Sequence, residues 1–315
     1  MRAEGIVIKS TGSWYTVKTD ANDKYRCKIR GKLRTWGFET TNPIAVGDRV
    51  EIETIDEETG LIIDIKERRN CIVRRAAKLS KRKHLLACNV DHAVLIVTVD
   101  FPKTHTEFID RFLVSAEAYK IPEKTLIINK MDLYNSEQMQ VVNEWTNIYR
   151  NIGYRVLHIS AVEGTNLEQV KDILKNKINV LVGNSGVGKS TLINAIDPSL
   201  NIKTSEISRK YKTGKHTTTF PQMYELYFGG YIIDTPGIRA FGTADLDKAD
   251  IAHNFPEMFA LLPYCKYKNC LHINEPGCAV KEALAEGKIA ISRYKSYLSM
   301  VLDENTKYRI DEYKA

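Results

Sequence analysis

The chain has 315 residues, which is enough for two or three domains, each with a core of its own. Its formal net charge is +7, a moderate basic excess that favours a polyanionic partner. No apolar run reaches the length of a membrane span, and the first residues lack the apolar core of a signal peptide. We therefore expect a cytoplasmic protein with no membrane partner.

Residues 1–69 contain five short segments in which apolar and polar residues alternate, with turn residues between them. The segments 5–9, 14–18, 25–29, 49–53 and 61–65 predict a small β-barrel, most plausibly an OB-fold. Such barrels often bind nucleic acid where cations lie beside an aromatic ring. The residues predicted to bind RNA here are Lys28, Arg30, Arg34 and Trp36, with Lys32 among them. A barrel that contacts protein or acts as a structural cap is the alternative, because a fold does not fix a function.

The segment between residues 66 and 84 carries nine Lys or Arg residues and a single acid. Residues 70–84 are predicted to be a basic linker between the barrel and the next domain. Such a run is often only a solvated linker, but its position favours contact with an RNA backbone, and that binding should weaken steeply with salt. The predicted contacts are Arg74, Arg75, Lys81, Arg82 and Lys83.

Residues 85–244 change to strand and helix in alternation. Apolar, β-branched segments predict strands, and segments with helical periodicity fall between them. The expected strands are 93–99, 125–129, 155–159 and 178–182, and the expected helices are 107–119, 136–151, 167–175 and 191–196. This pattern predicts a doubly wound α/β domain with a mostly parallel sheet, which binds ligands at the carboxyl ends of its strands.

A guanine-reading loop is predicted directly after one of these strands, at Asn129, Lys130 and Asp132. The Asp132 carboxylate can accept hydrogen bonds from N1–H and the exocyclic amine of guanine, a donor pair that adenine lacks. Asn129 and Lys130 would brace the loop and pack on the base. Ser160 and Ala161 follow the next strand, where a backbone N–H would reach the guanine oxygen.

A phosphate-binding loop is predicted between the strand at 178–182 and the following helix. Its glycines let backbone N–H groups turn toward a β-phosphate, and the helix N-terminus adds partial positive charge. Lys189 would reach the β- and γ-phosphates, and the Ser190 hydroxyl would bind Mg²⁺. The predicted GTP-binding residues are Gly183, Asn184, Ser185, Gly186, Val187, Gly188, Lys189, Ser190 and Thr191.

Two later segments match the switches of a GTPase. Asp234 lies where a carboxylate would hold Mg²⁺ through water, and Gly237 lies where a backbone N–H would sense the γ-phosphate. Of the three threonines at 217–219, Thr218 is the predicted Mg²⁺ ligand, with Thr219 as its neighbouring alternative. The guanine-reading loops precede the phosphate loop here, whereas a Ras-like chain has the opposite order. The motif order is therefore circularly permuted.

Residues 245–315 are predicted to form a mainly helical, metal-binding domain. Cys265, Cys270, His272 and Cys278 are closely spaced, and in a cytoplasmic chain such a cluster indicates a metal site and not a disulfide framework. Three thiolates and one imidazole are consistent with a closed structural zinc site; buried cysteines without metal are the alternative. A helix over 288–302 is expected to pack through Ile289, Tyr294, Leu298 and Val301.

Taken together, the chain resembles the RsgA-type GTPase family over essentially its whole length. The resemblance depends on the permuted motif order, the N-terminal barrel, the Gly-Lys-His-Thr-Thr-Thr sequence at 214–219 and the C-terminal Cys/His cluster. It implies GTP as the substrate, one structural zinc ion, and the small ribosomal subunit and its rRNA as the partner. It also implies stimulation by that subunit and action late in its assembly. A monomer is the simplest expectation.

The group that orients the hydrolytic water is less clear from the sequence. Ile238 follows Gly237 where Ras-like enzymes have glutamine, so we expect slow unaided turnover. The hypothesis is that His216 orients water once the ribosome orders its loop, with Arg209 or Arg239 as lesser candidates for charge stabilisation. An alternative function, which Ile238 keeps open, is a nucleotide-gated RNA-binding module in which GTP binding acts and turnover is incidental.

Overall fold

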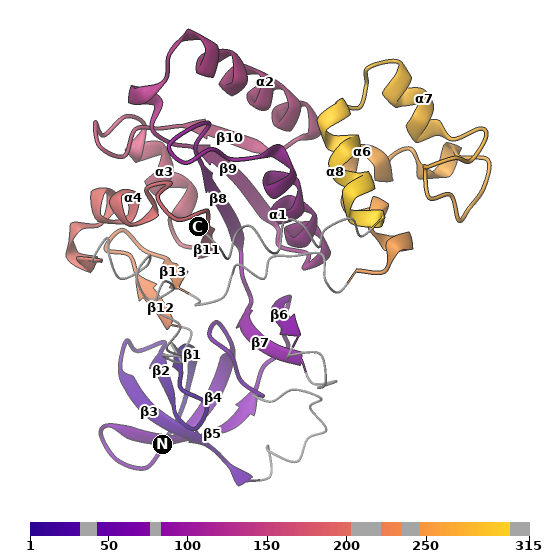
Figure 1. The fold of residues 1–315 in the computed structure, drawn as a ribbon. Coiled ribbons are helices and arrows are strands. Elements are labelled where there is room, and N and C mark those ends of the chain that lie inside the picture. Colours follow the sequence, from indigo (N-terminus) through magenta and orange to yellow (C-terminus); the bar gives the residue numbers. More distant parts are fainter. Residues whose placement is uncertain (32–42, 76–82, 203–221, 235–245, 303–315) are drawn as a thin grey trace, which may run out of the picture.

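A computed structural model describes residues 1–31, 43–75, 83–202, 222–234 and 246–302, and the structural statements below concern these residues (Figure 1). The N-terminal part is a five-stranded barrel. Its strands are β1 Arg2–Ser10, β2 Tyr15–Thr19, β3 Lys24–Ile29, β4 Arg49–Thr54 and β5 Thr59–Ile65. They pair in the order β1-β2-β3-β5-β4, and β4 pairs back with β1, which closes the barrel. This topology confirms the predicted OB-like fold.

Alternation explains why these segments fold as barrel strands. Val7, Tyr15, Val17 and Cys27 point inward and are 0–1% exposed, while intervening positions such as Arg26 face solvent. One buried face per strand is what a small barrel needs. The inward residues form a core of their own, separate from the cores of the α/β sheet.

A short hairpin follows the barrel. Strand β6 Cys71–Arg75 pairs with β7 Lys83–Cys88 in an antiparallel two-stranded sheet. Residues 70–84, which the sequence predicts to be a linker, thus include β6 and the start of β7. The base of the hairpin adjoins the barrel, because the Cys88 N–H donates to the Val46 carbonyl at 2.9 Å.

The central sheet has the order β10-β9-β8-β11-β13-β12. Its strands are β8 His92–Val97, β9 Glu123–Ile128, β10 Arg155–His158, β11 Ile178–Val182, β12 Gln222–Glu225 and β13 Tyr231–Asp234. All neighbours are parallel except β12 and β13, so the predicted mostly parallel sheet is confirmed. Strand β12 also pairs with β1 of the barrel through Gln222 and Lys9, which joins both parts into one eleven-stranded sheet.

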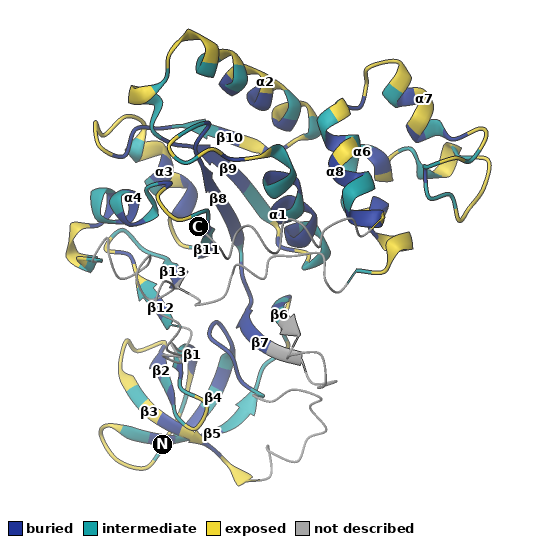
Figure 2. Cartoon of the chain, viewed as in Figure 1, coloured by how far each residue is buried: buried dark blue, intermediate teal, exposed yellow. Residues whose placement is uncertain are grey.

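Helices cover both faces of the central sheet, and Figure 2 shows its strands as largely buried. Helices α1 Thr106–Ala118 and α2 Ser136–Ile152 share one apolar cluster, which includes Phe112 and Trp145. Helices α3 Leu167–Leu174 and α4 Lys189–Ile196 share the cluster on the other face, which includes Val170 and Leu192. Two short 3₁₀ turns, η2 Met131–Leu133 and η3 Pro198–Leu200, lie at the ends of connecting loops.

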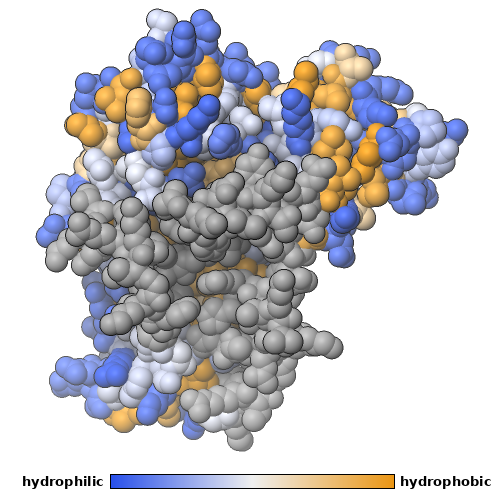
Figure 3. Space-filling model, in the orientation of Figure 1, coloured by the Kyte–Doolittle hydropathy of each residue, from blue (hydrophilic) through white to orange (hydrophobic). Residues whose placement is uncertain are grey.

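The C-terminal module, residues 246–302, is built from short helices. These are η5 Lys248–Asp250, η6 Ala252–Asn254, α6 Pro256–Phe259, η7 Leu262–Tyr264, α7 Ala279–Ala285 and α8 Ile291–Val301. The module packs against α1, whose Val114 belongs to its apolar core. On the face shown in Figure 3, hydrophobic residues gather over the part of the molecule where α6 and α8 lie.

The predicted packed face of the last helix is confirmed, but it is incomplete. Ile289, just before α8, and Val301 are buried in the core of the module, and Tyr294 and Leu298 are half-buried and pack against it. Helix α8 also buries Arg293, Tyr297 and Met300. The prediction considered only apolar side chains, so it did not include the basic Arg293.

Within the described residues, none of the helices combines the length and the apolar character that crossing a bilayer requires.

Candidate nucleotide site and metal centre

The glycine loop between β11 and α4 has a backbone that larger residues would not adopt without strain. Gly183, Gly186 and Gly188 have φ values of 158°, 85° and 95°. A Cβ on Gly183 would lie 2.3 Å from the Ile96 carbonyl oxygen, and one on Gly188 would lie 2.5 Å from Asn129 Nδ2. Glycine thus allows both the left-handed turns and the close approach of neighbouring groups. The loop ends at the N-terminus of α4, the arrangement that suits a phosphate.

Two polar side chains begin α4. The Lys189 ammonium donates to the Gly183 and Asn184 carbonyl oxygens at 2.6 and 2.7 Å, so the side chain folds back over the glycine loop. Ser190 is 8% exposed in the first turn of the helix. A cation and a hydroxyl thus lie at the end of the glycine loop, as phosphate and Mg²⁺ binding would require.

Asn129 joins the three predicted nucleotide loops. Its side chain is 1% exposed; Nδ2 donates to the Val187 carbonyl at 2.8 Å, and Oδ1 accepts from the Ala161 N–H at 3.1 Å. One amide therefore links the loop after β9, the glycine loop after β11 and the Ser-Ala turn after β10. Parallel neighbours bring these carboxyl ends to one edge of the sheet, so residues far apart in the sequence meet there.

The rest of the loop after β9 is fixed by contacts on either side. Lys130 has a φ of 65°, and its ammonium donates to the Phe101 carbonyl. The next N–H, that of Met131, donates to the Ile159 carbonyl at 3.1 Å. Asp132 lies in η2 with an exposed side chain, free to face a ligand. On the neighbouring turn, Ser160 is 1% exposed and its hydroxyl accepts from the Glu163 N–H at 3.1 Å.

Sequence reasoning missed Tyr134 as a support of this site. Its hydroxyl donates to the Asn129 carbonyl at 2.6 Å and accepts from the Val99 N–H at 2.9 Å. Burial raises the pKa of Tyr134 to about 12, so the phenol stays protonated and can donate. A tyrosine shortly after the motif has no recognisable pattern, because its role depends on the strand beside it.

The remaining predicted catalytic and magnesium residues are only partly covered. Asp234 is the last residue of β13, which pairs with β11 beside the glycine loop, but its side chain is outside the described part. His216, Thr217, Thr218, Thr219 and Gly237 lie outside the described residues.

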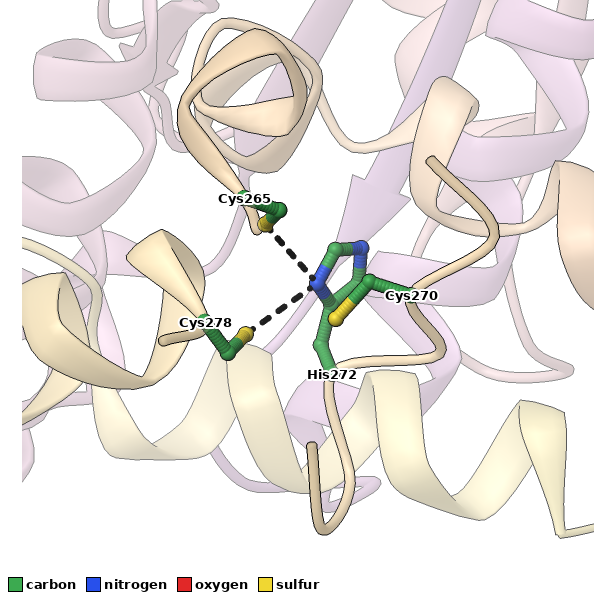
Figure 4. A group of neighbouring side chains, drawn as sticks. All are labelled: Cys265, Cys270, His272 and Cys278. Carbon is green, nitrogen blue, oxygen red and sulfur yellow. Dashed lines mark hydrogen bonds between the residues drawn. The ribbon is translucent and has the colours of Figure 1, made fainter. Parts of the chain in front are cut away.

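The four predicted metal ligands converge in the C-terminal module (Figure 4). The ligand atoms of Cys265, Cys270, His272 and Cys278 all lie within 4.8 Å of one another. His272 Nδ1 is 3.7 Å from Cys265 Sγ and 3.3 Å from Cys278 Sγ. Zinc bonds of about 2.3 Å to sulfur and about 2.0 Å to nitrogen in a tetrahedron would separate S and N by roughly 3.5 Å. The cluster therefore fits one tetrahedral metal ion.

Helix α8 and one carboxylate order the loop that carries two of these ligands. The Tyr294 hydroxyl donates to the His272 carbonyl at 2.6 Å, and the Tyr297 hydroxyl donates to the Leu271 carbonyl at 2.7 Å. The Glu275 carboxylate accepts from three loop N–H groups at 2.8–3.0 Å. Slight burial would raise the pKa of Glu275, but these donors lower it, so the carboxylate stays ionised. The ligand loop is thus held by groups that do not themselves bind the metal.

The barrel carries a cationic and aromatic surface, although not the whole of the predicted one. Lys28 Nζ lies 4.4 Å and Arg26 Cζ 4.2 Å from the ring centroid of Trp14. Trp14 and Arg26, with Lys9 and two threonines, line a pocket of about 260 Å³. Sequence reasoning missed Trp14; it directly precedes β2, so the pairing with β3 places it beside Lys28.

The other residues predicted to bind RNA contribute less here. Arg30 is paired with Glu53, 3.2 Å away, on the barrel surface. Arg34, Trp36, Lys81 and Arg82 lie outside the described residues, and Arg74, Arg75 and Lys83 are described only through the backbone of β6 and β7.

This combination of a central α/β sheet, a glycine loop entering a helix, and a guanine-type loop that precedes it in the chain defines a circularly permuted P-loop GTPase fold. The RsgA GTPase family model matches residues 65–244, and the RsgA N-terminal domain model matches residues 4–62. The chain belongs to the RsgA GTPase family, as the resemblance in its sequence predicted.

Relatives match over the full length. The chain is 50% identical over 314 residues to the small ribosomal subunit biogenesis GTPase RsgA of Christiangramia forsetii, covering 99% of both chains. It is 52% identical over 307 residues to RsgA 2 of Bacteroides thetaiotaomicron, covering 97% of this chain and 99% of the relative.

Two solved structures have the same fold. YjeQ from Thermotoga maritima is 37% identical with a TM-score of 0.81, covering 96% of this chain and 98% of its own. YloQ, described as a circularly permuted GTPase, is 30% identical with a TM-score of 0.77, covering 98% of this chain and 96% of its own.

Proposed function

We propose that this chain is a cytoplasmic GTPase that binds the small ribosomal subunit and its rRNA. It hydrolyses GTP to GDP and phosphate slowly alone and faster on the subunit, acts late in assembly and leaves after hydrolysis. The observation that carries the nucleotide assignment is the buried Asn129 amide, which holds the two base-side loops against the glycine loop. The small-subunit assignment is supported by relatives of about 50% identity that bear that name over nearly the whole chain.

In the proposed complex, Asp132 accepts from the guanine edge, and Asn129, Lys130, Ser160 and Ala161 position the base. The phosphates lie in the backbone cradle of residues 183–191, where the Lys189 ammonium exchanges its two carbonyl partners for phosphate oxygens. The exchange adds little strain because the lysine already lies over the loop. The Asp132 carboxylate is exposed to solvent, so it exchanges water for the guanine edge when the base binds.

Ser190, Thr218 and Asp234 would hold Mg²⁺. That ion would neutralise charge on the phosphates, as in other P-loop enzymes. Gly237 would sense the γ-phosphate, and His216 would orient the attacking water once the subunit orders its segment. Because Ile238 cannot hydrogen-bond to water, this chain needs such help for rapid turnover.

The Cys265, Cys270, His272 and Cys278 site is proposed to hold one structural zinc ion. Three thiolates and an imidazole are zinc ligands, and four protein ligands leave no open position for a reacting water. The bound ion would tie the η7 turn, the ligand loop and the start of α7 together.

Turnover of purified, zinc-loaded protein with and without small subunits tests the enzymatic proposal. A many-fold rise in GTP hydrolysis on the subunit is expected, and Asp132→Asn should shift preference from guanine toward xanthine nucleotides. A His216→Ala variant with unchanged stimulated turnover and unchanged GTP affinity would remove His216 from the mechanism. If subunits bind only the GTP form yet never accelerate hydrolysis, the nucleotide-gated RNA-binding module is the better description.

Asn129→Ala tests the site itself. It leaves a buried carbonyl and a buried N–H unpaired, at about 1–3 kcal/mol each and about 2–6 kcal/mol together, so GTP affinity should fall by roughly 30-fold or more. Asn135→Ala is the matched control: Asn135 lies six residues further along the chain, and its side chain accepts from the Gln138 N–H in the capping box of α2. Equal loss of GTP affinity in both variants would refute the role given to Asn129.

A further inference from the structure

The base of the β6–β7 hairpin holds two cysteines face to face. Cys71 and Cys88 are direct cross-strand partners in this antiparallel pair, and both are free thiols. The hairpin lies between the barrel and the central sheet (Figure 1), outside the nucleotide loops and the metal centre. Neither GTP binding nor zinc binding accounts for a pair of facing thiols at this place.

The hydrogen bonds fix the type of cross-strand pair. The Cys88 N–H donates away from β6, to the Val46 carbonyl at 2.9 Å, and the next residue, Asn89, donates to the Asn70 carbonyl at 2.9 Å. Cys71 and Cys88 therefore form a non-hydrogen-bonded pair, in which Cα atoms lie about 4.5 Å apart and side chains approach most closely. A disulfide needs Cα atoms about 4.4–6.8 Å apart, so the backbone already has a suitable spacing.

The two thiols differ in exposure and in charge environment. Cys88 is fully buried, whereas Cys71 is half-buried and is the one that a small oxidant reaches. The Arg68 guanidinium, held by two 2.7 Å contacts to the buried Asp48 carboxylate, lies close enough to act on both thiols. A hydrogen bond from Cys88 and the charge of Arg68 lower the pKa of Cys71, although burial opposes them. The hydrogen bond and burial raise the pKa of Cys88.

We propose that Cys71 and Cys88 are a reversible oxidation site, in which a peroxide converts the facing thiols into a disulfide. The Cys71 thiolate attacks one peroxide oxygen, the O–O bond breaks and hydroxide departs. Cys71 is then a sulfenic acid. The Cys88 sulfur then attacks Cys71 Sγ, the S–O bond breaks and water leaves, with the Cys88 proton passing to that leaving oxygen. Two thiols lose two electrons to one peroxide, and a dithiol reductant reverses the change.

The disulfide would close a loop over residues 72–87. That loop contains most of the basic residues of the segment between the barrel and the central sheet. Because β7 runs through Asn89 to Asp91 into β8, the bond would also fix one side of the connection between the two parts. Disulfides in cytoplasmic proteins are usually transient and redox-sensing, which is the behaviour expected here.

Peptide mapping of the full-length, zinc-loaded protein tests this proposal without reference to GTP hydrolysis. The protein is treated with hydrogen peroxide, its free thiols are alkylated, and it is digested with trypsin without reduction. We expect residues 70–74 linked to residues 84–103, a product that dithiothreitol removes. Zinc release is followed in the same samples, which separates this chemistry from oxidation of the metal ligands.

Variants define the outcome. Cys71→Ser changes only a half-buried residue and should abolish the linked peptide, whereas Cys27→Ser should leave it unchanged, since Cys27 lies alone in the barrel core with a pKa raised to about 12 by burial. Cys88→Ala should also abolish the linked peptide. Cys88 is fully buried, so this variant could misfold, but the peptide map of the wild-type protein tests the proposal without it. The proposal fails if both cysteines remain alkylated at peroxide doses that already release zinc. It also fails if Cys71 proceeds to sulfinic acid unlinked or pairs with another cysteine.

Discussion

The contact between α8 and α1 depends on a buried arginine. Arg293 is 1% exposed; Nη1 lies 2.8 Å from Asp110 Oδ1, and Nε and Nη2 lie 2.7 and 3.0 Å from the Glu257 carboxylate. Asp110 is itself fully buried and also accepts from the Tyr149 hydroxyl at 2.8 Å. Burial would lower the pKa of Arg293, but the two carboxylates raise it well above its usual value, so the guanidinium stays charged.

Arg293→Met removes the cation, fills similar space and leaves the Asp110 carboxylate without a counter-charge. Breaking a buried pair in this way costs about 3–5 kcal/mol. The cost should weaken the packing of residues 246–302 on α1, because Asp110 lies on α1 and Glu257 on α6. Arg111→Met is the matched control on the same interface. Its side chain is 21% exposed, pairs with Glu107 one turn away and donates to the Ser299 hydroxyl of α8 at 3.3 Å, so its loss should cost about 1 kcal/mol.

Native-state hydrogen exchange over peptides from α1 and α8 measures this difference. A loss of about 3–5 kcal/mol corresponds to exchange roughly 10²- to 5 × 10³-fold faster, against less than about tenfold for Arg111→Met. Adding Asp110→Asn to Arg293→Met removes the fully buried one of the two stranded carboxylates and should restore part of the protection, since a neutral side chain tolerates burial better. Equal acceleration in the two single variants would refute the reasoning, because burial would then not decide the cost.

Three further results are expected. The buried His92 ring bridges Asn179 and Thr125, and burial lowers its pKa to about 4. Folding therefore favours the neutral ring. The contribution of His92 to the free energy of unfolding is complete above pH 6.5 and falls by up to about 3 kcal/mol as the pH approaches 4. His92→Gln should flatten that part of the urea-unfolding pH profile, and an unchanged slope would contradict this account. Cys278→Ser should weaken zinc binding by more than about 100-fold in a chelator competition, since loss of outer-shell partners alone costs 10- to 100-fold, while Cys27→Ser should not. Lys18→Met, at the Glu225 contact between barrel and sheet, should cost about 1–2 kcal/mol in urea unfolding because Lys18 is 8% exposed.

Local sequence patterns predicted most of the fold. The alternation of apolar and polar residues, which buries Val7 and Val17 in the barrel core, predicts the barrel strands, and the turn residues between the segments separate them. Continuous apolar runs, such as the six buried residues of β8, identify strands that are covered on both faces. The four metal ligands were also predictable, because their spacing along the chain is short and their chemistry is distinctive.

Features that depend on partners from distant segments could not be read in this way. Arg293 looks like a surface residue until Asp110 and Glu257, from two other helices, are placed beside it. The hairpin of β6 and β7 was hidden because charge dominates the segment between its strands. Tyr134 links the Asn129 carbonyl to the Val99 N–H, which follows β8 and lies more than thirty residues earlier in the sequence.

The permuted order joins each predicted switch segment along the chain to a different flanking module. Segment 203–221, which holds the predicted switch threonines, leads directly into β12, and β12 pairs with β1 of the barrel. Segment 235–245, which holds Gly237, follows β13 in the chain and precedes the C-terminal module. Each switch is thus joined by its chain to a different module, whereas α1 and Arg293 hold the C-terminal module to the sheet independently. If the proposed switches move with the nucleotide, we expect the change either to be absorbed within its own segment or to strain the Lys18–Glu225 contact of the barrel or the Arg293–Asp110 contact of the C-terminal module.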